Sequence, residues 1–225
     1  MKTLLPTLAL TAAAAFVAAP AHAGSAHYLT GHGGLATSHT IVSGDVTITA
    51  TASAYNPGKQ ETHSAHVGQY RYGMGVTNGV YKNKWGRTRS TDGSHTVDGK
   101  GWKDTLWLSF DKPFEVLGAV FSYVDGNDGV NVVDGDGGLL GSYGLGSLRN
   151  KWGIAHLDLS ELEYTGTKIG FTARDSNDDW KVKAVKGEPG HTEAVPTPSA
   201  AAAGLLGLAA LSARRRRREE ETAAE

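Results

Sequence analysis

The sequence predicts an all-β fold, a β-sandwich or jelly roll, flanked by an N-terminal signal helix and a C-terminal apolar helix. The 225-residue chain has 30 glycines, and its short β-prone segments are separated by Gly, Asp and Asn turns. Its central part shows no sustained 3.6-residue apolar period, which argues against the crossover helices of a parallel α/β sheet. Many short strands between turns are typical of a sandwich.

Residues 1–23 form the first predicted unit, a secretory signal peptide. Lys2 gives a positive start, residues 4–17 are apolar, and Ala21-His22-Ala23 is a small-residue cleavage pattern. We therefore expect cleavage before Gly24 and export of the remaining chain. The apolar run is shorter than the roughly 20 residues of a membrane-spanning helix, and a retained anchor helix is the alternative.

Composition narrows the function of the exported chain. It has no cysteine, which excludes disulfides, cysteine metal sites and thiol nucleophiles. Lys and Arg number 22 against 23 Asp and Glu, so no basic excess points to nucleic acid. The sequence carries no Gly-x-Ser-x-Gly elbow, phosphate-binding loop or His-Glu-x-x-His motif, so catalysis has little support.

The exported body is expected to begin with a partly ordered lead-in at 24–40, rich in Gly, His, Ser and Thr, followed by the sandwich at 41–187. Residues 45–55 read DVTITATASAY, in which apolar and hydroxyl side chains alternate, so a strand with one apolar face is predicted. The turn Asn56-Pro57-Gly58 ends it. Further along, Asn78-Gly79 predicts a two-residue hairpin between short strands.

The second half of the body supplies the remaining strands. Residues 104–110 form one that Pro113 is expected to break, and residues 114–124, apolar on both faces, suit a central strand. Further strands are predicted at 130–133 and within GIAHLDL, KIGFTA and WKVKAV, which begin at Gly153, Lys168 and Trp180.

The C-terminal part changes character. Residues 188–199 form a polar linker, 200–213 carry no charge, and 214–225 hold an arginine cluster and an acidic tail. A helix over 200–213 would measure about 20 Å, less than the roughly 30 Å hydrocarbon core. The arginines would stay on the cytoplasmic side, which leaves the body outside. The alternative is a soluble Ala-rich helix.

This tail resembles a PEP-CTERM sorting signal, the C-terminal tag that exosortases read. The resemblance is carried by a Pro-x-Pro motif, an apolar segment and a basic cluster: Pro196, Thr197, Pro198, Arg214, Arg215, Arg216, Arg217 and Arg218. Thr197 replaces the Glu that the tag usually has, and EEETAAE follows the arginines. The resemblance implies inner-membrane anchoring, processing by an exosortase near the Pro-Thr-Pro motif, and a surface or extracellular location, often with exopolysaccharide or biofilm matrix.

The body is also similar to a β-sandwich ectodomain found in PEP-CTERM proteins. The similarity covers most of 68–185 and implies no established catalytic activity. It is carried by ten positions: Gly73, Gly75, Val76, His95, Val97, Asp98, Asp104, Pro113, Tyr123 and Asp125.

Two acidic regions are the best candidate site. Oxygen ligands in Gly-rich loops suit Ca²⁺, so calcium is the candidate cofactor of these loops. The eight candidate ligands are Asp125, Asn127, Asp128, Asp134, Asp136, Asp175, Asn177 and Asp179. The second loop is not an EF-hand, because Trp180 replaces its Gly and Lys186 its final Glu. The alternative is that Asp and Asn form β-turns.

Tryptophan offers a second candidate. Trp107 and Trp180 lie in predicted strands and are expected in the core, whereas Trp85, Trp102 and Trp152 lie in loops and could stack on sugar rings. The function predicted from the sequence is therefore a non-catalytic surface or matrix protein. The alternatives are a carbohydrate-binding module, with or without calcium, and a polysaccharide hydrolase with two carboxylates across a cleft.

Overall fold

The computed structural model describes residues 24–190, except 83, 86–87 and 91–94, and it is all-β over this range. Both predicted flanking helices lie outside the described residues. Among the described residues, no helix is long and apolar enough to cross a membrane. The elements are β1 (Ser25–Tyr28), β2 (Gly34–Ala36), β3 (Ser38–Ser43), β4 (Val46–Asn56), β5 (Glu61–Tyr70), β6 (Gly73–Thr77), β7 (Val80–Lys82), β8 (Thr88–Ser90), β9 (Val97–Asp98), β10 (Lys103–Ser122), β11 (Gly129–Asp134), β12 (Leu139–Gly144), β13 (Ala155–Asp158), the 3₁₀ turn η1 (Ser160–Leu162), β14 (Thr165–Ala173) and β15 (Asp179–Pro189).

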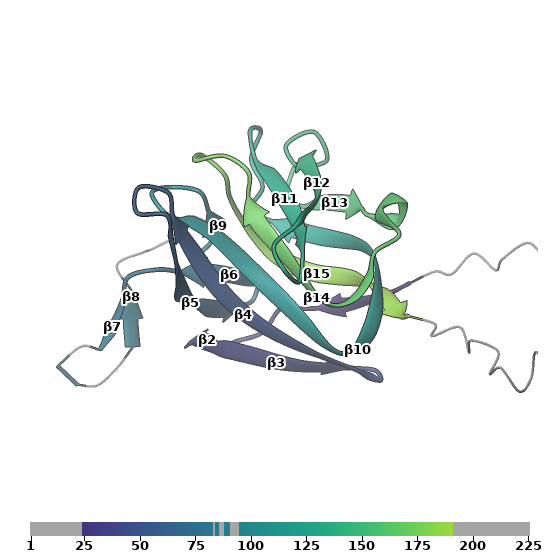
Figure 1. Cartoon of the computed structure of the whole chain (residues 1–225), viewed down its shortest axis with the longest axis horizontal. Helices are drawn as coiled ribbons and strands as arrows, with labels where there is room; N and C mark the ends of the chain where they lie inside the picture. Colours follow the sequence, from purple (N-terminus) through teal and green to yellow (C-terminus); the bar gives the residue numbers. More distant parts are fainter. Residues whose placement is uncertain (1–23, 83, 86–87, 91–94, 191–225) are drawn as a thin grey trace, which may run out of the picture.

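Antiparallel pairing joins 13 of the described strands into one sheet, and β7 pairs with β8 separately (Figure 1). Strands β4, β5, β6, β15 and β10 form a closed ring, because β10 pairs with both β4 and β15. Strands β14, β11 and β12 extend from the other side of β10. The predicted absence of parallel βαβ units is thus confirmed for the described residues.

The alternating strand predicted at 45–55 is confirmed as β4. Val46, Ile48 and Ala50 are fully buried, whereas the threonines between them remain partly exposed. The buried face packs with Leu106 and Leu108 of the neighbouring β10 in a single core cluster. Period-two patterning therefore places this strand with one face on the core.

The prediction that Pro113 breaks a strand was wrong. Strand β10 runs unbroken over 20 residues. Its first half pairs with β4 and β14 and its second half with β13 and β15, with a register shift between Ser109 and Phe114. Proline lacks an N–H group, and the exchange of partners is where a missing ladder hydrogen bond is tolerated.

The Asn78-Gly79 hairpin was also predicted wrongly. Strand β6 pairs with β5 and β15, and β7 pairs with β8, so the two strands flanking Asn78-Gly79 are not partners in the described sheet. Gly79 does adopt a positive φ of 61°, and the Asn78 amide donates to Asp104 at 2.5 Å. Local turn chemistry is present, but the chain leaves the sheet here (Figure 1).

The expected lead-in at 24–40 is structured. Strand β1 pairs with β15, β2 pairs with β5 and β3 pairs with β4, and Leu29 is fully buried. Residues 24–40 show no apolar periodicity, so their strands could not be predicted locally. They are ordered by backbone pairing with strands that are distant in sequence. The body also extends past the expected boundary at 187, because β15 reaches Pro189.

Candidate functional site

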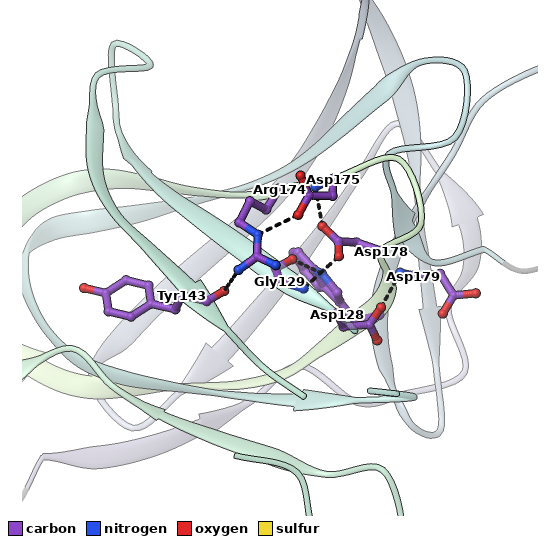
Figure 2. A network of polar contacts seen from close by, with 8 residues as sticks. Asp128, Gly129, Tyr143, Arg174, Asp175, Asp178 and Asp179 are labelled. Carbon is purple, nitrogen blue, oxygen red and sulfur yellow. Dashed lines mark hydrogen bonds and ion pairs between the residues drawn. The ribbon is translucent and has the colours of Figure 1, made fainter. Parts of the chain in front are cut away.

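The structure brings three of the eight predicted ligands together. Carboxylate oxygens of Asp125, Asp128 and Asp179 lie within 4.8 Å of one another. Asp125 and Asp128 belong to the β10–β11 loop, and Asp179 begins β15. Asp128 and Asp179 are 51 positions apart in sequence, and they meet because the start of β15 lies beside the β10–β11 loop (Figure 2).

Two aspartates tie these loops together reciprocally. Asp128 accepts hydrogen bonds from the N–H of Asp125 at 2.8 Å and of Asp179 at 3.1 Å. Asp178 accepts from the N–H of Asp175 at 2.5 Å and of Gly129 at 2.8 Å. Each carboxylate therefore closes its own loop and binds the residue that follows the other carboxylate. We call Asp128 and Asp178, with these four N–H groups, the aspartate clasp.

Both aspartates of the clasp are buried, each with 1% of the residue's surface exposed. A buried carboxylate is stable only with hydrogen-bond donors, and each one has two here. The repeat Asp-x-Asn-Asp, at 125–128 and 175–178, produces the clasp. The repeat is visible in the sequence, but it indicates a reciprocal clasp only when the two loops are compared with each other.

Further contacts hold the clasp in place. The Trp180 indole donates to the carbonyl of Gly129 at 2.9 Å, and Arg174 binds Asp175 at 2.8 Å (Figure 2). The carbonyl of Asp128 accepts from the N–H of Leu145 at 2.8 Å, which attaches the β12–β13 loop. A Cβ at Gly129 would lie 2.4 Å from the Arg174 guanidinium carbon, so a larger residue there would have to displace this flexible side chain from its contact with Asp175.

Burial and mutual repulsion disfavour the state in which Asp125, Asp128 and Asp179 are all ionised. Burial raises the pKa of Asp128 to about 6; its two N–H donors oppose this shift, and the charges of Asp125 and Asp179 add to it. The pKa of Asp179 is also raised, chiefly by burial and then by Asp125. A cation bound between these carboxylates would relieve the repulsion.

The cluster fits calcium only in part. Ca²⁺ takes six to eight oxygens, and three carboxylates supply a minority of them. Both oxygens of Asp128 already accept N–H groups, so the exposed Asp125 and Asp179 would be the main protein ligands. Calcium therefore stays a prediction for this cluster.

The other predicted ligands serve turns. One oxygen of Asp134 accepts from the N–H groups of Asp136 and Gly138, which closes the β11–β12 turn. Asn127 donates its N–H to Asp125, and Asp175 pairs with Arg174. Asn177 is exposed in the second loop. For Asp134 and Asp136 the turn interpretation describes what the structure shows.

The three loop tryptophans do not form one platform. Trp85 and Trp152 are 72% and 73% exposed, but Trp85 lies between β7 and β8, which project from the body, and Trp152 precedes β13 (Figure 1). A lysine ammonium lies over each ring, at 4.4 and 4.5 Å from the centroid. Trp102 is half-buried, stacked on His63 at 4.9 Å.

Two tryptophans were expected in the core, and this prediction is confirmed for Trp180 but wrong for Trp107. Trp180 is fully buried. Trp107 is half-buried, because its neighbours Leu106 and Leu108 occupy the inner face of β10 and turn it outward. There its indole donates to Ser53 at 2.9 Å and the Lys168 ammonium lies 4.3 Å from the ring centroid.

The predicted cleavage residues Ala21 and Ala23 and the predicted sorting residues, from Pro196 to Arg218, lie outside the described residues. Gly24 is the first described residue and is followed directly by β1. In comparisons with known proteins, the chain matches no family model, no curated protein and no solved structure.

Proposed function

We propose that the protein is an exported, non-catalytic β-sandwich ectodomain that a PEP-CTERM-like tag delivers to the cell surface or extracellular matrix. An exosortase-type enzyme acts on Pro196-Thr197-Pro198, after the arginine cluster has held the chain at the inner membrane. The tripartite tail and the signal peptide motivate the delivery route. The sandwich architecture is supported by β10, which takes different partners in its two halves.

The observation that carries the proposal is the tripartite C-terminal pattern of the sequence, and the pairing of β1 with β15 is compatible with it. Strand β1 starts at Ser25, one residue after the proposed signal cleavage, and pairs with β15, with Ser25 opposite Gly187. The body therefore starts and finishes on adjacent strands (Figure 1). Cleavage at Gly24 and near Pro196 would remove both processing segments and leave every strand of the described body intact.

The test is a processing and localisation experiment in a strain that carries an exosortase. An epitope inserted at Gly58, in the exposed β4–β5 turn, avoids the paired β1 strand. We expect the wild-type chain to lose about 3 kDa of its 23.6 kDa beyond signal removal and to reach the cell surface. Replacing Arg214–Arg218 by alanine should abolish both events.

Two matched variants sharpen this experiment. Replacing the five arginines by lysine keeps the positive charge, so membrane retention should persist. Thr197→Glu restores the usual Pro-Glu-Pro motif and should not lower the processed fraction. Unprocessed protein that stays in the periplasm, whatever the five residues are, would refute the sorting proposal. Release of new reducing ends from exopolysaccharide would refute its non-catalytic part and favour a hydrolase.

A further inference from the structure

A second candidate site is an aromatic pocket of about 370 Å³, whose lining residues Tyr123 and Lys181 are each two positions from Asp125 and Asp179 of the acidic cluster. The size falls at the lower end of the range for small-molecule sites. Loops and strands that are distant in sequence line it, with His32 from the β1–β2 loop, Arg71 and Tyr72 from the β5–β6 turn, and Lys181 from β15. The full lining is His32, Tyr70, Arg71, Tyr72, His95, Tyr123 and Lys181.

Two tyrosine rings form a corner at the mouth of the pocket. Tyr72 and Tyr123 are 48% and 52% exposed, and their rings meet edge to face at 5.6 Å and 87°. A planar aromatic ligand stacks best in a slot between parallel faces. A corner of two perpendicular rings instead suits a thicker ring, with an apolar C–H face for one tyrosine and hydroxyl groups at its edge for the other.

The pocket is held in shape by its surroundings. Ser122 donates to the carbonyl of Tyr72 at 2.6 Å, which fixes the β5–β6 turn against β10. The Lys181 ammonium donates to the carbonyl of His95 at 2.8 Å and lies 4.9 Å from the centre of the Tyr123 ring. Backbone φ angles of 62° at Tyr123 and 50° at His95 are unusual for these residues, and such strain gathers at binding sites.

The lining favours an anion at Arg71, because the charge of the buried Lys181 also acts on Asp179 outside the pocket. Among the described residues that line the pocket, Arg71 and Lys181 are cationic and none is Asp or Glu. The Arg71 guanidinium is exposed and lies 5.5 Å from the centre of the Tyr72 ring, so it stands at the same corner as the stacking surface. Guanidinium binds a carboxylate with two parallel hydrogen bonds.

We propose that this pocket binds an acidic saccharide, a uronic-acid unit whose ring stacks on Tyr72 or Tyr123 and whose carboxylate pairs with Arg71. The site goes beyond the proposed function and does not depend on sorting, since an unsorted chain would keep it. It also differs from the loop tryptophans that the sequence suggested.

The test is calorimetric titration of the purified full-length chain with tetragalacturonate and with its methyl ester, which keeps the sugar rings but removes the charge. We expect the acid to bind about tenfold more tightly than the ester, as one charge-assisted contact allows. Added salt should weaken binding of the acid alone. Arg71→Gln should reduce the acid to the level of the ester, and Lys59→Gln, at an exposed turn, should change neither.

Tyr72→Ala tests the stacking. It should weaken both ligands several-fold, whereas Tyr28→Ala, at a similarly exposed tyrosine of β1, should leave them unchanged. Unchanged melting temperatures show that the variants fold. Equal affinity for acid and ester, tighter binding of the planar anion 4-hydroxybenzoate, no effect of Arg71→Gln, or no binding at millimolar concentration would each overturn the proposal.

Discussion

Replacing Asp178 by alanine should destabilise the protein far more than the same change at Asp134. Each carboxylate accepts two backbone N–H groups. They differ in burial, because Asp178 is 1% exposed and the Asp134 turn faces solvent. The comparison therefore isolates the effect of burial at a constant number of hydrogen bonds.

The magnitude follows from what the lost acceptor leaves behind. Without Asp178 the N–H of Gly129 stays buried and unpaired, which costs about 1–3 kcal/mol, and the half-buried N–H of Asp175 adds roughly 1 kcal/mol. Removal of a buried charge returns part of this. We expect Asp178→Ala to lower the free energy of unfolding by about 2–4 kcal/mol, and Asp134→Ala by about 1 kcal/mol or less, since water replaces its bonds.

Urea unfolding followed by tryptophan fluorescence measures both values, with linear extrapolation at equal slopes. Asp128→Asn and Asp178→Asn together should also be non-additive by about 0.5–3 kcal/mol, because each side chain orders the loop that the other binds. A loss at Asp178 no larger than at Asp134, or strict additivity of the two asparagine variants, would refute the reciprocal clasp.

Three further predictions concern the same loops and the core. The pKa of Asp128 is about 6 in the folded state, against 3.8 ordinarily, so between these values the folded state binds more protons than the unfolded state. The free energy of unfolding should therefore fall as pH rises from about 4 to 6. Asp128→Asn should flatten this part of a profile of melting temperature against pH, measured in the presence of a chelator. Calcium at millimolar concentration should raise the melting temperature at pH 7; Asp125→Asn should remove the rise and Asp134→Asn should keep it, and a rise that survives Asp125→Asn would exclude this cluster. His27 is 5% exposed, packs edge-on against Phe114 and has both ring nitrogens unpaired within the described structure, so His27→Phe should stabilise the protein by about 1 kcal/mol or more in urea unfolding; destabilisation would show that the ring has a partner.

Local patterns predicted the strands well where one face is buried. The alternation in β4 and the apolar second half of β10 both follow from the period-two geometry of a strand. Acidic turns were placed correctly as loops because Asp and Asn bond to their own backbone, as Asp134 does. The all-β class follows from these local signals alone.

Local patterns did not predict which strands pair with each other. Residues 24–40 became strands because β15, β5 and β4 offer edges to them, and Pro113 lies inside a strand because β10 exchanges partners there. Asn78-Gly79 turns the chain without making a hairpin, since β6 finds β5 and β15 instead.

The candidate sites divide in the same way. The sequence by itself determined where the acidic Asp-x-Asn-Asp loops and the loop tryptophans occur, and it predicts two processing segments, because each is a local pattern of residue types. Tertiary structure alone decided that Asp128 and Asp178 bind each other's loops, and that Tyr72, Tyr123 and Arg71 share one pocket. The physical reason is that side-chain periodicity and turn chemistry act over a few residues, whereas burial, charge and shape at a site are set by strands that meet from distant parts of the chain.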